Sequence, residues 1–103
     1  MSNTIGELYV VMIKLLRENK FADVGVVNTR HLRSITEFNN DREFLDYVGT
    51  TYADELIIRK NGRKAFTECI YFHQFKGFKH NEKSITIYLN TGSNTLVKKN
   101  IRF

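Results

Sequence analysis

A β-hairpin centred on Asn61-Gly62 is the feature that most constrains how this chain folds. The dipeptide lies between two β-prone segments, Glu55–Lys60 and Arg63–Glu68. Asn-Gly favours a two-residue type I′ turn, because both central residues of that turn take positive φ angles. The pattern therefore predicts two antiparallel strands joined by a tight turn.

The turn also predicts which residues face one another across the hairpin. In a two-residue turn Lys60 lies opposite Arg63, and Arg59 lies opposite Lys64. Directly opposed like charges are unfavourable unless they are solvated or meet an anion. We therefore expect a four-charge basic tip, with the pairs Ile58/Ala65 and Ile57/Phe66 anchoring the base of the ribbon on the core.

A second hairpin is predicted near the end of the chain. Residues Lys83–Leu89 alternate in polarity, a loop follows at Asn90–Asn94, and Thr95–Phe103 returns. The inward residues of the first strand are expected to be Ile85, Ile87 and Leu89. Between the hairpins, Cys69–Phe78 is interpreted as a helical turn ending at Gly77.

The first half of the chain predicts helices. Thr4-x-x-Glu7 is typical of a capping box, and apolar residues recur at helical spacing up to about Lys20. Asp23–Val27 reads as a brief strand or an extended connection. Two short helices are expected next, over Thr29–Phe38 and from a cap at Asp41 through Phe44, Leu45 and Val48.

These elements indicate an α+β fold, with N-terminal helices packed on one face of an antiparallel sheet built from two hairpins. A chain of 103 residues supports one hydrophobic core. We therefore expect a single domain over residues 1–103, with a helical part at about 4–54 and a β-hairpin part at about 55–103.

Composition predicts a cytoplasmic protein without a membrane segment. The chain has one cysteine, and its longest apolar stretch, Leu8–Leu16, contains Lys14 and is far shorter than the roughly 20 residues of a membrane span. Proline and tryptophan are absent while asparagine, lysine and isoleucine are frequent, a bias that we expect of an AT-rich, phage-like genome.

Charge is distributed unevenly along the chain. Residues 1–55 carry six basic and nine acidic side chains, whereas residues 56–103 carry ten basic and two acidic ones. Clustered cations raise the local potential and release counterions when they meet phosphates. The second half therefore predicts a surface that binds a polyanion, whose candidate residues are Arg59, Lys60, Arg63, Lys64, Lys76, Lys79, Lys83, Lys98 and Arg102.

Aromatic residues and a second basic group extend this prediction. Bases of single-stranded nucleic acid stack on aromatic side chains, for which Tyr71, Phe75, Phe78 and Tyr88 are candidates beside the default role of core packing. A secondary candidate site is the start of the expected Thr29–Phe38 helix, with Arg30, His31 and Arg33.

Signals for chemistry are sparse. Cys69-x-x-x-His73 and nearby His80 have zinc-ligand side chains, but a fourth ligand is missing, so no metal and no cofactor is expected. His73, Glu68 and Tyr71 are types that a metal-independent ribonuclease uses, at no diagnostic spacing. Gly-rich phosphate loops, nucleophile elbows and paired carboxylates are absent from the sequence.

Three functions remain open from the sequence. The leading hypothesis is a non-enzymatic nucleic-acid-binding protein, regulatory or ribonucleoprotein-like, that binds RNA or DNA through the basic hairpin. The first alternative is a protein-interaction module, such as a phage-type inhibitor or structural subunit, that binds an acidic protein. The second is a small ribonuclease. The strand ending at Phe103 is also a candidate sheet edge for pairing with another copy of the chain.

Overall fold

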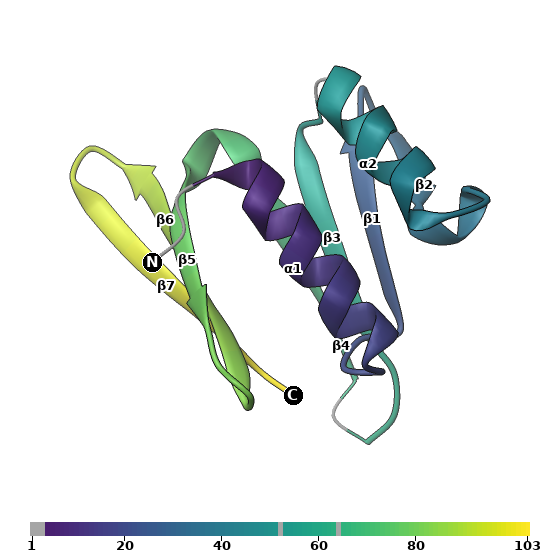
Figure 1. Cartoon of the computed structure of the whole chain (residues 1–103). Helices are drawn as coiled ribbons and strands as arrows, with labels where there is room; N and C mark the ends of the chain where they lie inside the picture. Colours follow the sequence, from purple (N-terminus) through teal and green to yellow (C-terminus); the bar gives the residue numbers. More distant parts are fainter. Residues whose placement is uncertain (1–3, 52, 64) are drawn as a thin grey trace.

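The computed structural model describes residues 4–51, 53–63 and 65–103 and shows an α+β fold (Figure 1). The described residues form two α-helices and two antiparallel sheets, which confirms the predicted fold class. The single sheet of the prediction is instead two sheets, with strand orders β2-β1-β3-β4 and β5-β6-β7. The elements are α1 (Ile5–Arg17), β1 (Asp23–Asn28), β2 (His31–Ser34), α2 (Asp41–Thr50), β3 (Glu55–Lys60), β4 (Phe66–Tyr71), β5 (Phe75–His80), β6 (Ser84–Gly92) and β7 (Thr95–Arg102).

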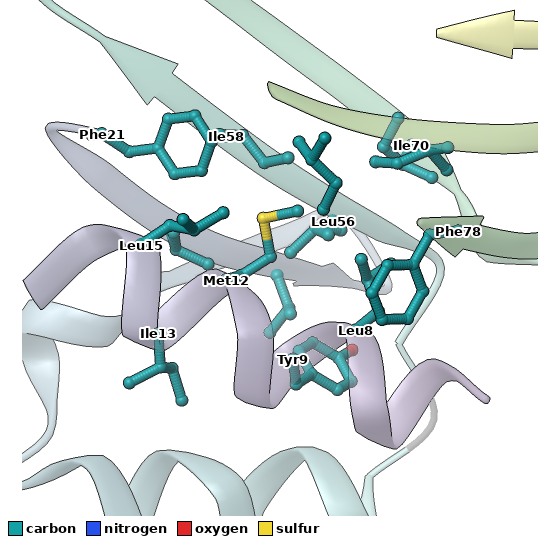
Figure 2. Packing of buried hydrophobic residues seen from close by; sticks show 14 of the residues in the cluster. Leu8, Tyr9, Met12, Ile13, Leu15, Phe21, Leu56, Ile58, Ile70 and Phe78 are labelled. Atoms are coloured by element: carbon teal, nitrogen blue, oxygen red, sulfur yellow. The ribbon is translucent and has the colours of Figure 1, made fainter. Parts of the chain in front are cut away.

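Helix α1 forms as its sequence predicts. The Thr4 hydroxyl accepts a hydrogen bond from the Glu7 amide at 3.1 Å and donates one to Glu7 Oε1 at 2.7 Å, which caps the first turn. Side chains on one helix face are buried, and Figure 2 shows them against Leu56 and Ile58 of β3 and Phe78 of β5. The helix therefore packs on residues of both sheets.

One hydrophobic core joins the two sheets and both helices. Helices α1 and α2 cover the same face of the four-stranded sheet, and α1 also contacts β5 of the three-stranded sheet (Figure 1). The fully buried strand residues of this core alternate along the sequence, as expected for strands with one face inside. They include Val24, Val26, Leu56, Ile58, Ile70, Ile85 and Ile87.

The predicted helix over Thr29–Phe38 is wrong. Thr29 and Arg30 have φ angles of 50° and 67° and form the turn between β1 and β2, in which Asn28 pairs with His31. The Thr29 amide donates to Asp54 Oδ2 at 3.2 Å, which helps to hold this unusual backbone. Only a 3-10 turn, Ile35–Glu37, follows β2. Pairing with buried β1 overrides the weak helical pattern.

Helix α2 confirms the second short helix, with a cap one residue earlier than predicted. Asn40 Oδ1 accepts a hydrogen bond from the Glu43 amide at 2.9 Å, so Asn40 and not Asp41 is the N-cap. Asp41 instead forms an ion pair with Arg17, and that guanidinium lowers the pKa of the Asp41 carboxyl. The pair ties the end of α1 to the start of α2.

The β3–β4 hairpin is confirmed, but its predicted register is wrong. Lys60 pairs with Phe66 and Arg59 pairs with Thr67, so residues 61–65 form the connection instead of two residues. The slip of three residues reverses the face of every β4 side chain, because successive strand residues point to opposite faces. It brings Ile70 into the core and Phe66 against it, and this burial outweighs the preference of the Asn-Gly turn.

The segment after β4 differs from its prediction, whereas the second hairpin is confirmed. Cys69 belongs to β4, and Gly77 lies in β5 beside a bulge. Among the described residues of this segment, the only helical turn is the 3-10 turn Phe72–Gln74. Strands β6 and β7 turn at Ser93-Asn94, inside the predicted loop. Ile85, Ile87 and Leu89 are buried, as expected.

Gly25 lies where the backbone of β2 passes close to β1. A Cβ atom at this position would lie 2.9 Å from the Arg33 carbonyl oxygen and 3.3 Å from Ser34 Cα, both of them backbone atoms. We expect Gly25→Ala to lower the free energy of unfolding by about 1–3 kcal/mol, because β2 must shift to make room. Urea denaturation followed by circular dichroism measures the change.

The matched control for this substitution is Gly49→Ala. Gly49 lies in α2, and a Cβ atom there would meet nothing within 4 Å. Alanine is the better helix former, so this variant should be unchanged or more stable by up to about 1 kcal/mol. Equal losses at the two positions would contradict the close approach of β2 to Gly25.

Candidate nucleic-acid interface

The three-stranded sheet turns one side of each strand away from the core. Because Ile85 and Ile87 of β6 are buried, strand alternation places the residues between and beside them on the opposite side. The pairing register adds their neighbours on β5 and β7. We call this surface the outer face of β5–β7; it carries the rows Lys79/Thr86/Asn100, Gly77/Tyr88/Lys98 and Ser84/Arg102.

The outer face of β5–β7 is positively charged. Lys79, Lys98 and Arg102 are exposed, and exposed Lys76 lies at the bulge between Phe75 and Gly77. None of residues 75–80, 84–92 and 95–102, all within the described part of the chain, is Asp or Glu. Cations without carboxylates among them create a positive potential that attracts polyanions.

Tyr88 provides the aromatic residue of this face. It is half-buried and lies opposite Lys98 in the β6–β7 ladder. In the adjacent row, Asn100 Nδ2 donates a hydrogen bond to Thr86 Oγ1 at 2.7 Å. Tyr88 is thus an aromatic ring beside cations on the sheet surface, the arrangement on which an unpaired base stacks.

The other candidate aromatic residues have different surroundings. Phe78 is 1% exposed and belongs to the core, against which Phe75 also packs. Tyr71 is 46% exposed, but it lies on the uncovered face of the four-stranded sheet, beside Cys69 and Glu55. The structure therefore brings only Tyr88 of the four to the basic face.

The basic hairpin lies at one end of this surface. Arg59 faces Asp23 across the β1–β3 ladder, with 4.0 Å between Nη2 and Oδ2, and Lys60 points to the other side of β3. Arg63 is exposed in the connecting loop, and Lys64 lies outside the described residues. The predicted four-charge cluster of opposed pairs therefore does not form, because the register differs.

Two further basic residues join the hairpin to the outer face. Lys60 lines a pocket of about 300 Å³ together with Arg102. Lys83 is exposed in the β5–β6 turn, where its carbonyl accepts a hydrogen bond from the Phe103 amide at 3.0 Å. The C-terminus lies near the β3–β4 loop in Figure 1, so these cations belong to one end of the molecule.

The secondary site predicted at Arg30, His31 and Arg33 is placed elsewhere. These residues lie at the β1–β2 turn, which the β1–β3 register puts at the opposite end of β3 from the basic loop. The Arg33 guanidinium lies 4.3 Å from the ring centroid of Phe38 and 4.7 Å from that of Tyr47. Arg33 therefore packs β2 against α2 through cation–π contacts.

Of the residues considered for metal binding or catalysis, Tyr71 and His73 lie close together, with 6.0 Å between their ring centroids. Cys69 lies in β4, His73 in the 3-10 turn and His80 at the end of β5. Among residues 4–51, 53–63 and 65–103, no three His, Cys, Asp or Glu side chains gather as a metal site requires. Glu68 and Tyr71 point to opposite sides of β4 by strand alternation, so the ribonuclease set is not assembled.

The Cys69 thiol is held by Glu55. Its Sγ donates to Glu55 Oε1 at 2.6 Å on the uncovered face of the four-stranded sheet. Burial, and then the hydrogen bond and negative charge of Glu55, raise the pKa of Cys69 from the ordinary value of 9.0 to about 11. The side chain is therefore a neutral thiol near neutral pH and not an activated nucleophile.

Sequence reasoning missed the role of Lys99. Its Nζ lies 3.1 Å from Glu68 Oε2 and 3.3 Å from the Cys69 carbonyl oxygen, so it links β7 to β4 on the inner side. Strand alternation was the available signal, since Lys98 and Lys99 are neighbours and must face opposite sides. The sequence also offered no sign that Asn100 and Phe103 lie beside Lys60.

The chain matches no known protein-family model, no curated protein and no solved structure. The described helices are too short or too polar for any of them to cross a membrane. The candidate interface therefore rests on its own residues and geometry.

Proposed function

We propose that the chain is a non-enzymatic nucleic-acid-binding protein that uses the outer face of β5–β7. The observation that supports this proposal is an open sheet face with no carboxylate on its strands. On this face Lys98 lies beside Tyr88, Lys79 lies in the next row, and Arg102 lies in the row after that. The cations contact phosphates, and the ring of Tyr88 stacks on a base. Unlike the hairpin tip alone, this surface spans three strands and is fixed by the core beneath it.

The spacing of the rows suits a nucleic-acid backbone. Rows of the same face are two residues apart along a strand, which is about 7 Å. Lys79 lies in one row and Lys98 in the next, on the two outer strands of the sheet. A strand of nucleic acid laid across the sheet would therefore pass several cations in succession, with Lys60, Arg63 and Lys83 extending the charged surface at one end.

A second candidate function is protein binding, in which the same cations meet an acidic partner. The uncovered face of the four-stranded sheet favours it, because Leu32 is 53% and Tyr71 is 46% exposed there. A pocket of about 280 Å³ lies on that face, lined in part by Leu32, Gly25 and Ile57. Exposed apolar groups of this kind are typical of protein contacts.

Fluorescence anisotropy with labelled oligonucleotides distinguishes the two functions. Replacing Lys79 and Lys98 by alanine removes two cations of the outer face, and we expect affinity at low salt to fall about tenfold. The dependence of log affinity on log salt should become shallower by about 1 to 1.5, because each lost phosphate contact reduces it by about 0.7 on a single strand.

The matched control is the double substitution Lys14→Ala and Arg42→Ala. Both residues are exposed and lie on α1 and α2, so the control removes the same charge without changing the outer face of β5–β7. It should retain the salt slope of the wild type. Equal losses in the two variants would mean that net charge alone causes binding, and no binding by the wild type at low salt would favour the protein partner.

A further inference from the structure

A pocket opens where the end of β7 meets the β3–β4 hairpin. It has a volume of about 300 Å³, and its apolar walls are Phe66 of β4 and Ile101 and Phe103 at the end of the chain. The rings of Phe66 and Phe103 pack edge-to-face on Phe21, with centroids 6.4 and 5.6 Å from it. The aromatic walls are thus held in place by a third ring that is itself buried.

The rim of the pocket is polar and mainly cationic. Lys60, Arg102 and Asn100 line it, and Asn100 and Arg102 also belong to the outer face of β5–β7. The pocket is therefore continuous with the surface that we propose for phosphate binding. A chain of phosphates crossing that surface would reach the pocket at Arg102.

The one carboxylate in the lining is already compensated. Glu68 forms an ion pair with Lys99, with 3.1 Å between Oε2 and Nζ, so its charge is balanced by a cation on the inner side of β7. Lys60 and Arg102 consequently leave the pocket with a net positive environment. An anionic ligand with a flat apolar part fits this combination of charge and aromatic wall.

We propose that this pocket takes one unpaired base of a single-stranded nucleic acid whose phosphates lie on the outer face of β5–β7. The inference rests on the proposed function and adds the class of nucleic acid. Its volume is at the small end for ligand pockets, as a single base requires. The Asn100 amide can hydrogen-bond a base edge, and a base already paired in a duplex cannot enter such a pocket.

The test compares three labelled probes on the wild-type protein by fluorescence anisotropy. They are a ten-nucleotide single strand, the same strand with abasic sites throughout, and the corresponding duplex, in DNA and in RNA versions. We expect the single strand to bind about tenfold more tightly than the abasic strand, because stacking on aromatic side chains contributes at each base. Equal affinity for the normal and abasic strands, or tighter binding of the duplex, would overturn the inference.

Variants then assign the base effect to the pocket. Phe103→Leu keeps an apolar side chain against Phe21 but removes the ring, and Asn100→Ala removes the amide. Both should lose the part of the preference for the normal strand that does not come from stacking on Tyr88, and Phe103→Leu should keep the affinity for the abasic strand. A preference that is as large in both variants as in the wild type would place the base elsewhere and contradict the pocket.

The outcomes separate this inference from the proposed function. If the wild type binds none of the probes at low salt, the proposed function itself fails. If binding is salt-sensitive but indifferent to the presence of bases, the phosphate contacts of the proposed function stand, whereas stacking on Tyr88 and the pocket inference both fail. The DNA and RNA arms of the comparison identify which sugar the surface accepts.

Discussion

Replacing Phe44 by alanine is expected to lower the free energy of unfolding by about 3–5 kcal/mol. Phe44 is fully buried, and its ring packs edge-to-face on Tyr9 of α1 and on Phe38, with centroid separations of 6.1 and 5.4 Å. Alanine would leave a cavity between the two helices. Domains of this size have total stabilities of about 5–15 kcal/mol, so the variant would keep only part of its stability. Urea denaturation at low temperature, where the variant is still folded before urea is added, measures the loss.

Val10→Ala is the control for this loss. Val10 lies on α1 but is 55% exposed, so its truncation should change stability by no more than about 0.5 kcal/mol. A loss below about 1 kcal/mol for Phe44→Ala would mean that α2 is not held on the sheet by this ring.

Alkylation of Cys69 should be roughly a hundred times slower in the folded protein than in the unfolded chain at pH 8. The reacting species is the thiolate, and raising the pKa from 9.0 to about 11 reduces its fraction in proportion. The rate of reaction with iodoacetamide, with and without denaturant, measures the difference. Because the folded pKa is raised, this thiol contributes stability below about pH 9 that is lost as pH rises through 11.

Glu55→Gln tests the second cause of this shift. The substitution removes the negative charge beside Cys69 Sγ but leaves the burial of the thiol in place. The folded variant should therefore react faster than the folded wild type, while the two unfolded chains react alike. Equal rates in the two folded proteins would assign the raised pKa to burial alone.

Local sequence signals predicted the elements that depend on neighbours along the chain. The capping pattern of Thr4 and Glu7 located α1, and the alternation at Ile85, Ile87 and Leu89 located β6. Strand β2 was not predicted, because its own residues show no strand pattern and it is stabilised by pairing with β1. The hairpin register was wrong because burial of Phe66 and Ile70, a tertiary effect, overrode the turn preference.

The candidate interface was predictable as a set of charges but not as a surface. Lys79, Lys98 and Arg102 were each identified from the sequence, yet only the pairing of three strands puts them on one face. The contacts of Arg33 with Phe38 and Tyr47 could not be predicted, because they depend on where α2 packs. The positions of side chains that meet through non-local contacts can be predicted only when the fold is known.

The alternation of β6 and β7 also bears on how this protein can evolve. Tyr88 and Lys98 face outward, whereas their chain neighbours Ile87 and Lys99 serve the core and the link to β4. Adjacent codons thus meet different demands, one set at the exposed surface and the other in folding. Substitutions at the outward positions can therefore change the surface of this sheet without disturbing the core beneath it.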